Sequence, residues 1–412
     1  MVAYMRNVKL IALFVCLLGT AACPRNDPAD PDGGGGMACK GDGDCAAGTL
    51  KACDLTAQPA VCVQCIPGGN VSACTGTTPI CDTAKTCRGC TLDSECASGL
   101  CAPDGACAAA GDIAYVGGAG AGGTTCTQAA PCAKLVDALA LNKGYIRVTG
   151  TTTHDADTVI DNKNVTIVGG ANAKITRTGG GPNGNVLRIA GTSKVTLKGL
   201  EISGGDGDGV QVDGGELKVL ASKLQGNKGI GLNVAAGNVS VSGSMFNNND
   251  GGGLLVADNL KLELTNSFIV KNAKNTGLRI LKPGAGTKIE YNTIVDNIDE
   301  GTGITDTGGV LCDDATFTFR NNIIFRNTGG VAANPQTVGA CKFDGSFVAV
   351  GTGPTDDTLK FKSAMDYHLT ATSPGSVRDV SGTVCTGLVD YDGDARPQGT
   401  ACDLGADEYK LP

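Results

Sequence analysis

The chain contains no tryptophan, and only 4% of its 412 residues are aromatic. Histidine is scarce as well, since His154 and His368 are the only two, and this leaves little room for histidine-based catalysis. Basic residues (33) are outnumbered by acidic ones (41), and the net charge of −8 argues against a nucleic-acid-binding surface. The apolar run Leu10–Leu18 is much shorter than the roughly 20 residues that span a bilayer as a helix.

Glycine and cysteine are in excess instead, with 63 and 20 residues. Glycine at that number is about twice its usual share of roughly 7%. The apolar share of 41% is ordinary, which argues against wholesale disorder. A length of 412 residues predicts about two or three domains rather than one compact core.

The first 22 residues have the pattern of a secretory signal peptide, with basic residues before the apolar run and small residues after it. Residues 17–23, LLGTAAC, resemble a bacterial lipobox, which implies cleavage before Cys23 and acylation of that cysteine. Thr20 stands where the motif most often has leucine, and an ordinary signal peptide is the alternative. Pro24, in place of the aspartate that retains many such proteins on the inner membrane, implies the outer membrane. We therefore expect an outer-membrane, lipid-anchored protein that is periplasmic or surface-exposed.

Twelve cysteines lie between Cys39 and Cys107, and this density in an exported protein predicts disulfides. We expect three modules, each with its first cysteine paired to the third and its second to the fourth. The modules are Cys39, Cys45, Cys53 and Cys62; Cys65, Cys74, Cys81 and Cys87; and Cys90, Cys96, Cys101 and Cys107. CxxC motifs at the module junctions leave zinc ligation as the alternative, which an oxidising compartment disfavours.

From about Tyr145 the chain repeats apolar-x-apolar pairs, a strand pattern, with glycine and asparagine between them. One inward series steps by 22, 22, 23, 25 and 30 residues through Ile202, Leu224, Phe246, Ile269, Ile294 and Ile324. Three strands per repeat of about 22 residues predict a right-handed parallel β-helix. A leucine-rich repeat is the main alternative, but its consensus leucines are missing.

Other columns share this repeat. Glycines at 209, 231, 253, 277 and 303 predict turns with positive φ, and asparagines at 227, 249, 272, 297 and 327 predict a stacked amide ladder. Three residues before each glycine stand Asp206, Lys228, Asp250, Lys274 and Glu300, which predicts a ladder of alternating charge. A further apolar series predicts that the pair Ile289/Tyr291 stacks on Leu262/Leu264.

Six cysteines outside the modules are expected to pair by proximity, because short loops close at low entropic cost. The expected pairs are Cys126–Cys132, Cys312–Cys341 and Cys385–Cys402. Cys312 and Cys341 are 29 residues apart, about one coil, so that this bond is expected to join neighbouring coils.

The tail carries the motifs DYHL (366–369), DGDARP (392–397) and DLGADEY (403–409). Together they resemble the choice-of-anchor Q domain, which ends bacterial surface β-helix proteins, and residues 115–131 resemble the start of pectin-lyase-like β-helix proteins. The resemblance implies a cell-surface right-handed β-helix and no established reaction. An apolar periodicity over residues 133–141 predicts a helix that caps the first coil.

The expected organisation has six parts. They are a lipoprotein signal peptide (1–22), a flexible tether (23–37), cystine-rich modules (38–108), a lead-in segment with the capping helix (109–142), the parallel β-helix (143–330), and C-terminal coils with the choice-of-anchor Q-like tail (331–412).

Candidate functional residues are few. Asp206, Asp208 and Asp250 are the candidate metal ligands, with Ca²⁺ as the ion they would suit and no other cofactor implied. The outward charged positions on the strands are Lys218, Lys223, Glu263, Arg279 and Glu290, from which a groove for polysaccharide could be assembled.

Three functions fit these observations. The favoured one is a non-catalytic protein that binds a glycan or a cell surface and is tethered to the membrane by its lipid anchor. A polysaccharide lyase on the β-helix face is the alternative, although the aspartate-pair and Arg-x-Lys motifs of pectinases are absent. The third is a structural spacer without a ligand. Nucleic acid is not an expected partner.

Overall fold

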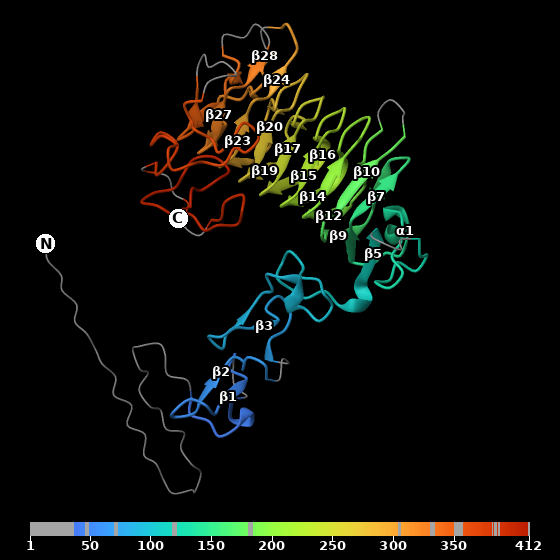
Figure 1. Ribbon diagram of the computed structural model, residues 1–412, viewed down its shortest axis with the longest axis vertical. Helices are drawn as coiled ribbons and strands as arrows, with labels where there is room; N and C mark the ends of the chain where they lie inside the picture. Colours follow the sequence, from blue (N-terminus) through green and yellow to red (C-terminus); the bar gives the residue numbers. More distant parts are fainter. Residues whose placement is uncertain are drawn as a thin grey trace, which may run out of the picture. The chain divides into compact units, whose positions relative to one another are not determined.

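The computed structural model describes residues 37–45, 49–69, 73–117, 122–179, 184–303, 306–329, 334–349, 357–380, 382, 385 and 388–410. The protein is all-β, a right-handed parallel β-helix preceded by a disulfide-rich segment, which confirms the predicted fold class (Figure 1). The chain forms two compact units, residues 1–74 with 81–87 and residues 75–80 with 88–412. The predicted signal peptide and Cys23 lie outside the described residues. Within the described ranges, no helix is long and apolar enough to span a membrane.

The cystine-rich modules are pinned by six disulfides, which join the first cysteine of each module to the third and the second to the fourth. The pairs are Cys39–Cys53, Cys45–Cys62, Cys65–Cys81, Cys74–Cys87, Cys90–Cys101 and Cys96–Cys107. Short elements lie between them: η1 (Asp42–Cys45), β1 (Ala52–Asp54), β2 (Val61–Val63), β3 (Ile80–Cys81), β4 (Cys87–Arg88) and η3 (Asp93–Glu95). Because each of these sulfurs is bonded to another, none is available to ligate zinc.

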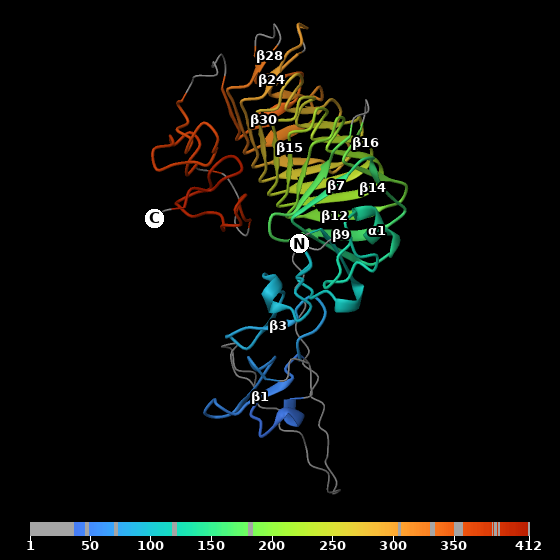
Figure 2. The same cartoon turned by 45° about the vertical axis from the view of Figure 1, so that its right-hand side comes forward.

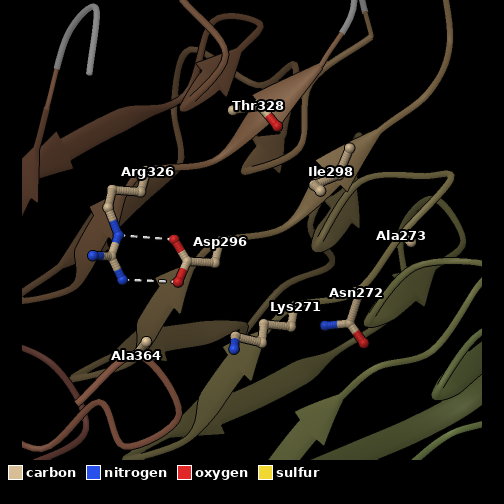
Figure 3. A pocket seen from close by; sticks show the side chains of 8 residues that line it. All are labelled: Lys271, Asn272, Ala273, Asp296, Ile298, Arg326, Thr328 and Ala364. Atoms are coloured by element: carbon tan, nitrogen blue, oxygen red, sulfur yellow. Dashed lines mark hydrogen bonds and ion pairs between the residues drawn. The ribbon is translucent and has the colours of Figure 1, made fainter. Parts of the chain in front are cut away.

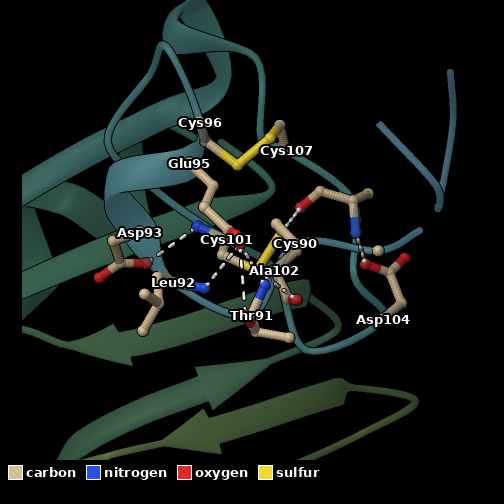
Figure 4. Close-up of a disulfide and its surroundings, with 12 residues drawn as sticks. Cys90, Thr91, Leu92, Asp93, Glu95, Cys96, Cys101, Ala102, Asp104 and Cys107 are labelled. Atoms are coloured by element: carbon tan, nitrogen blue, oxygen red, sulfur yellow. Dashed lines mark hydrogen bonds between the residues drawn. A yellow bond between two sulfur atoms is a disulfide. The ribbon is translucent and has the colours of Figure 1, made fainter. Parts of the chain in front are cut away.

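Hydrogen bonds close the loop of the third module around its two disulfides (Figure 4). The Glu95 carboxylate accepts the N–H groups of Thr91 and Leu92 at 2.7 and 3.1 Å and pairs with Arg88 at 2.5 Å. The Arg88 guanidinium and these two N–H groups lower the pKa of Glu95 to about 2. Cross-links and local polar contacts therefore hold a module whose apolar core is small.

The N-terminal end of the β-helix is covered. Helix α1 (Leu135–Ala140) buries Leu135, Ala138 and Leu139 in the core of the β-helix. It lies where the sequence predicts a capping helix. The third cystine module adds Leu100, which shares a buried cluster with Ile113 and Val168. Covering this end removes an open sheet edge that would otherwise pair with other chains.

Each coil of the β-helix contributes a strand to each of three faces, and the strands stack in parallel along the axis (Figure 1). Face 1 holds β8 (Thr158–Asp161), β11 (Leu187–Ala190), the first parts of β14 (Val210–Leu220) and β16 (Leu232–Ser242), β18 (Leu254–Val256), β21 (Leu278–Ile280), β25 (Val310–Leu311) and β29 (Thr337–Val338). Face 2 holds β5 (Ile113–Gly117), β6 (Tyr145–Thr149), β9 (Asn164–Gly169), β12 (Lys194–Lys198), the second parts of β14 and β16, β19 (Leu262–Thr265), β22 (Lys288–Glu290), β26 (Thr318–Arg320) and β30 (Lys342–Asp344).

Face 3 is a nine-stranded parallel sheet. It holds β7 (Thr151–His154), β10 (Lys174–Arg177), β13 (Glu201–Ser203), β15 (Lys223–Gln225), β17 (Met245–Asn247), β20 (Phe268–Val270), β23 (Thr293–Val295), β27 (Ile323–Phe325) and β31 (Phe347–Val348). Two further short strands, β24 (Ile298–Asp299) and β28 (Thr328–Gly329), pair in parallel beyond face 3. Strands β29, β30 and β31 extend the three faces past residue 330.

The centre of face 3 confirms the predicted inward series. Ile202, Leu224 and Phe246 stack in register on consecutive strands, and the series continues through Ile269, Ile294 and Ile324. All six side chains are fully buried. The period-two pattern therefore gave both the strand and the direction in which its middle residue points.

Two columns of buried polar side chains join the coils along the axis. In the predicted ladder each asparagine amide donates to the next amide oxygen at 2.8 to 2.9 Å, from Asn227 through Asn249, Asn272, Asn297 and Asn327 to Gln336. A second column that the sequence did not suggest runs through Ser222, Ser244, Ser267, Asn292, Asn322 and Ser346, each accepting a backbone N–H from the preceding coil.

The glycine column is real, but its predicted reason is wrong. Gly209, Gly231 and Gly253 do not have positive φ. A Cβ atom on any of them would lie 2.5 to 2.7 Å from the carbonyl oxygen of the corresponding glycine in the next coil. Close approach between coils, rather than a left-handed turn, therefore requires glycine there.

Two predictions of register fail in the later coils. Leu278 pairs with Val310, so that Gly309, and not Gly303, follows Gly277 in the column. The predicted stacking of the pair Ile289/Tyr291 on Leu262/Leu264 would place Tyr291 on Leu264. Leu264 instead pairs with Ile289. In these longer coils the extra residues form loops between the strands. The loops change the number of residues per repeat, whereas the strands stay in register.

The C-terminal segment, residues 357–410, folds back against the outer surface of face 3 at the later coils (Figure 2). There the outward strand positions are apolar, namely Phe268, Val270, Val295, Ile323 and Phe325, and they are buried under Leu359, Tyr367, Leu369, Val377, Leu404 and Ala406. The predicted disulfide pairs Cys126–Cys132, Cys312–Cys341 and Cys385–Cys402 are all formed, and the last of them contacts Tyr291 beside this segment.

The DLGADEY motif contacts the β-helix directly. Gly405, at φ +81°, lies where a Cβ would meet Thr293 and Ile323, and its N–H donates to Asn321 O at 2.9 Å. Behind it, the buried Arg396 guanidinium pairs with Glu408 at 3.0 Å. The motif residues thus build the interior of the segment and its docking surface.

We expect Asn249→Ala to lower the free energy of unfolding by about 3 kcal/mol, because each buried group left without a partner costs roughly 1–3 kcal/mol. The Asn249 amide donates to Leu224 O and Asn272 Oδ1 at 2.9 Å and accepts from Asn227, all within the core. Denaturant unfolding measures the change, and exposed Asn238→Ala is the control. Equal stability of the two variants would contradict the structural role of the ladder.

A second prediction concerns the buried ion pair. Arg396→Met leaves the Glu408 carboxylate buried without its cation, which costs about 3–5 kcal/mol in such sites. We expect the C-terminal segment to become sensitive to limited proteolysis. Lys410→Met, which removes an exposed lysine paired with Asp394, is expected to change nothing. Cleavage at the same rate in both variants would refute the prediction.

Candidate functional site

The strands of face 3 end in turns that share one backbone conformation. The residue after the strand has positive φ in six successive coils, at Gly204, Gly226, Asn248, Lys271, Asp296 and Arg326. Glycine adopts this region freely, whereas a bulky residue there is strained by about 1–3 kcal/mol. Lys271 and Arg326 are therefore costly for the fold, whereas aspartate adopts this region more readily, and such strain is typical of functional sites. We call this row of six residues the turn line.

A cavity of about 390 Å³ lies at the charged end of the turn line (Figure 3). It is lined by Lys271, Asn272, Ala273, Asp296, Ile298, Arg326, Thr328 and Ala364. Ala364 comes from the C-terminal segment, and the other residues belong to three successive coils. The volume of the cavity lies within the range of about 300–1,000 Å³ that is typical of small-ligand sites.

An ion pair forms one wall of this cavity. The Arg326 guanidinium binds Asp296 through two nitrogens, each 2.8 Å from a carboxylate oxygen (Figure 3). The Tyr367 hydroxyl donates to the same carboxylate at 2.8 Å, and burial together with the Asp296 charge raises the pKa of Tyr367. The guanidinium also lies over the Phe361 ring, 5.8 Å from its centre. These contacts hold Asp296 and Arg326 rigidly in place.

Lys271 is the second cation that lines the cavity, besides Arg326 (Figure 3). Its ammonium group lies 2.6 Å from the Met365 sulfur, and within the described part of the chain no carboxylate is within ion-pair distance of it. A positive charge at a cavity without its own counter-ion favours a negatively charged ligand.

A second depression continues along the same row of turns. It has a volume of about 350 Å³ and is lined by Gly204, Gly226 and Asn248 of the turn line, together with Lys174, Thr176, Glu201, Ser203 and Gln225 of face 3. At about 4.8 Å per coil, the six turns cover roughly 24 Å. The two cavities together suit an extended ligand better than a compact one.

The five charged residues expected to form a groove point outward but do not share one surface. Lys218, Glu263 and Glu290 lie on face 2, Lys223 lies on face 3, and Arg279 lies on face 1. Sequence alternation shows that a residue points outward, but only the assignment of its strand to a face shows in which direction. Lys218 and Glu263 line one depression of about 280 Å³ on face 2, but the five residues together form no common groove.

The three candidate calcium ligands are not brought together. Asp206 pairs with Lys228 at 2.5 Å, and Asp250 pairs with Lys274 at 3.1 Å. The Asp208 carboxylate instead accepts Ile230 N–H and the Asn233 amide, both at 2.8 Å. Neighbouring lysines and local amides occupy these carboxylates, so they do not converge on a common point.

The same contacts show how far the predicted charge ladder extends. Asp206, Lys228, Asp250 and Lys274 stack in adjacent coils, with direct pairs at the first and the last step. Glu300 was expected from Gly303, which is not in the glycine column, and among the described residues Lys274 pairs with Asp250 and not with Glu300. The contacts therefore support four of the five predicted members.

The residues of the cavity escaped the sequence analysis, although a signal was present. Lys271, Asp296 and Arg326 each stand immediately before an asparagine of the predicted ladder. Glycine or asparagine stands at the same place in earlier coils, as Gly226 and Asn248 do. A change from small residues to charged ones within one column marks positions that the repeat alone does not require.

Known proteins resemble this chain mainly through the repeat. A family model described as "Right handed beta helix region" matches residues 185–347. Among solved structures, the crystal structure of pectate lyase Pel9A matches with 15% sequence identity and a TM-score of 0.42, over 72% of this chain and 96% of that chain. A match this weak carries no argument about chemistry. No curated protein matches the chain.

Proposed function

We propose that the protein binds acidic polysaccharides along the turn line without cleaving them. The observation that carries the proposal is the Lys271 ammonium at the rim of a 390 Å³ cavity, with a second depression aligned beside it. Uronate carboxylates suit such a cation, since a hydrogen bond to a charged group is worth about 1.5–3 kcal/mol. An extended chain of sugars fits a site that repeats with each coil.

The composition of the site supports a polar mode of recognition. None of the residues that line the two cavities is aromatic. Binding would therefore depend on charge and hydrogen bonds more than on stacking of sugar rings against side chains. This favours a charged glycan over a neutral one.

The decisive test compares two neighbouring lysines. We expect Lys271→Gln to weaken binding of polygalacturonate or alginate at least tenfold, equivalent to about 1.4 kcal/mol. Lys274→Gln is the matched control, because Lys274 is exposed and already paired with Asp250. Affinities are measured by titration calorimetry, with a neutral glucan as the reference ligand.

Equal losses in the two variants, or no binding of any acidic polymer, would refute the proposed site. The same incubations are followed by ultraviolet absorbance for unsaturated uronate products. Their appearance would overturn the non-catalytic part of the proposal and favour a polysaccharide lyase.

We also propose that the protein is anchored to the outer membrane through acylated Cys23. The lipobox resemblance of residues 17–23 supports this, and several acyl chains are enough for stable attachment, at about 0.8 kcal/mol for each buried CH₂. Residues 24–36, rich in proline, aspartate and glycine, would separate the folded part from the lipid surface.

Cys23→Ser is expected to release the protein from the membrane fraction and to abolish incorporation of labelled fatty acid. Cys16→Ser is the matched control, because Cys16 lies within the predicted signal peptide and would be removed with it. Membrane association and lipid label that persist in Cys23→Ser would rule out this anchor.

A further inference from the structure

A histidine and two aspartates converge within the C-terminal segment. The His368 imidazole and the carboxylates of Asp392 and Asp407 each offer a ligand atom, and these atoms lie within 4.8 Å of one another. They come from three separate stretches of the segment, the motifs DYHL, DGDARP and DLGADEY. Donor atoms bound to one ion at about 2.0–2.2 Å lie within such distances of each other.

The two nitrogens of His368 have different surroundings. Nδ1 faces the Asp366 carboxylate in a short hydrogen bond. Nε2 is buried and makes no hydrogen bond within the described part of the chain, although Asp392 Oδ2 lies 3.2 Å away. The second nitrogen of a metal-binding histidine almost always donates to a carboxylate, a backbone carbonyl or water, and Asp366 takes that place here.

The surroundings fix the imidazole further. The ring packs edge-on against Phe268 of β20, at 5.3 Å between ring centres, and against Tyr391 at 5.9 Å. Asp407 is buried and accepts Leu369 N–H at 2.6 Å through one of its oxygens. Asp392 is about half exposed, so that the cluster is open to solvent on its side.

We propose that His368, Asp392 and Asp407 bind a divalent transition ion, with Zn²⁺ as the best fit and Asp366 as the positioning residue. Imidazole nitrogen selects zinc and its neighbours over calcium, and carboxylate oxygens complete a four-coordinate site with water. An ion there ties three stretches of the C-terminal segment together. The structure assigns no such role to Asp206, Asp208 or Asp250.

The test uses the full chain, stripped of metal with a chelator and titrated calorimetrically with Zn²⁺, Mn²⁺ and Ca²⁺. We expect one Zn²⁺ site per chain, weakened at least tenfold in Asp392→Asn and in His368→Gln. Asp392→Asn is the informative variant, because Asp392 is exposed and its loss should not unfold the segment. Asp366→Asn is expected to weaken Zn²⁺ binding less, and its readout is a shift in the pH at which the ion binds.

Two matched variants serve as controls. Asp394→Asn changes an aspartate two residues from Asp392 that pairs with Lys410, and His154→Gln removes the other histidine. Both should bind Zn²⁺ like the parent chain. Zn²⁺ should also protect the segment 357–410 from proteolysis in the parent but not in Asp392→Asn. Absence of Zn²⁺ binding, a preference for Ca²⁺, or equal affinity in Asp392→Asn and Asp394→Asn would each overturn the proposal.

Discussion

The hydrogen-bonded stacking of one coil on the next is the constraint on which the rest of this structure depends. Backbone ladders supply it on three faces, and the buried amide column from Asn227 to Gln336 adds a side-chain ladder inside the turns. Because a buried amide without its partner is costly, each coil must place its asparagine at the same height and angle. The residue just before it is thereby placed as well, and this is how Lys271, Asp296 and Arg326 come to stand in one row.

The two ends of face 3 serve different purposes as a result. In the early coils its outward positions are polar. Lys174 and Glu201, for example, form a solvent-accessible ion pair at 2.9 Å. In the later coils the outward positions are apolar, as in Phe268 and Phe325, and the C-terminal segment covers them. The cavity with Lys271 lies where this cover meets the turn line, so both elements are needed to form it.

Prediction from the sequence succeeded wherever a local rule decided the outcome. Apolar alternation gave the inward series through Phe246, and cysteine spacing gave the pairs from Cys39–Cys53 to Cys385–Cys402. Prediction failed where residues were counted across a long loop, as at Gly303 and Tyr291. A loop between two strands can have any length while the strands stay in register, so the repeat length does not fix the position of a residue beyond it. The glycine column was found for the wrong reason, since the close approach of the next coil is not visible in one coil alone.

The sequence by itself determined the repeat, the inward residues, the amide ladder and the disulfides, because each of these depends on spacing along the chain and on side-chain type. Only the tertiary structure decided which outward residues share a surface, since the three strands of a coil face three directions. It also decided which distant groups meet. His368, Asp392 and Asp407 converge because the C-terminal segment folds back on face 3, and Lys271 borders a cavity that Ala364 of this segment also lines. Contacts of this kind depend on how separate stretches of chain pack against each other, which no local pattern records.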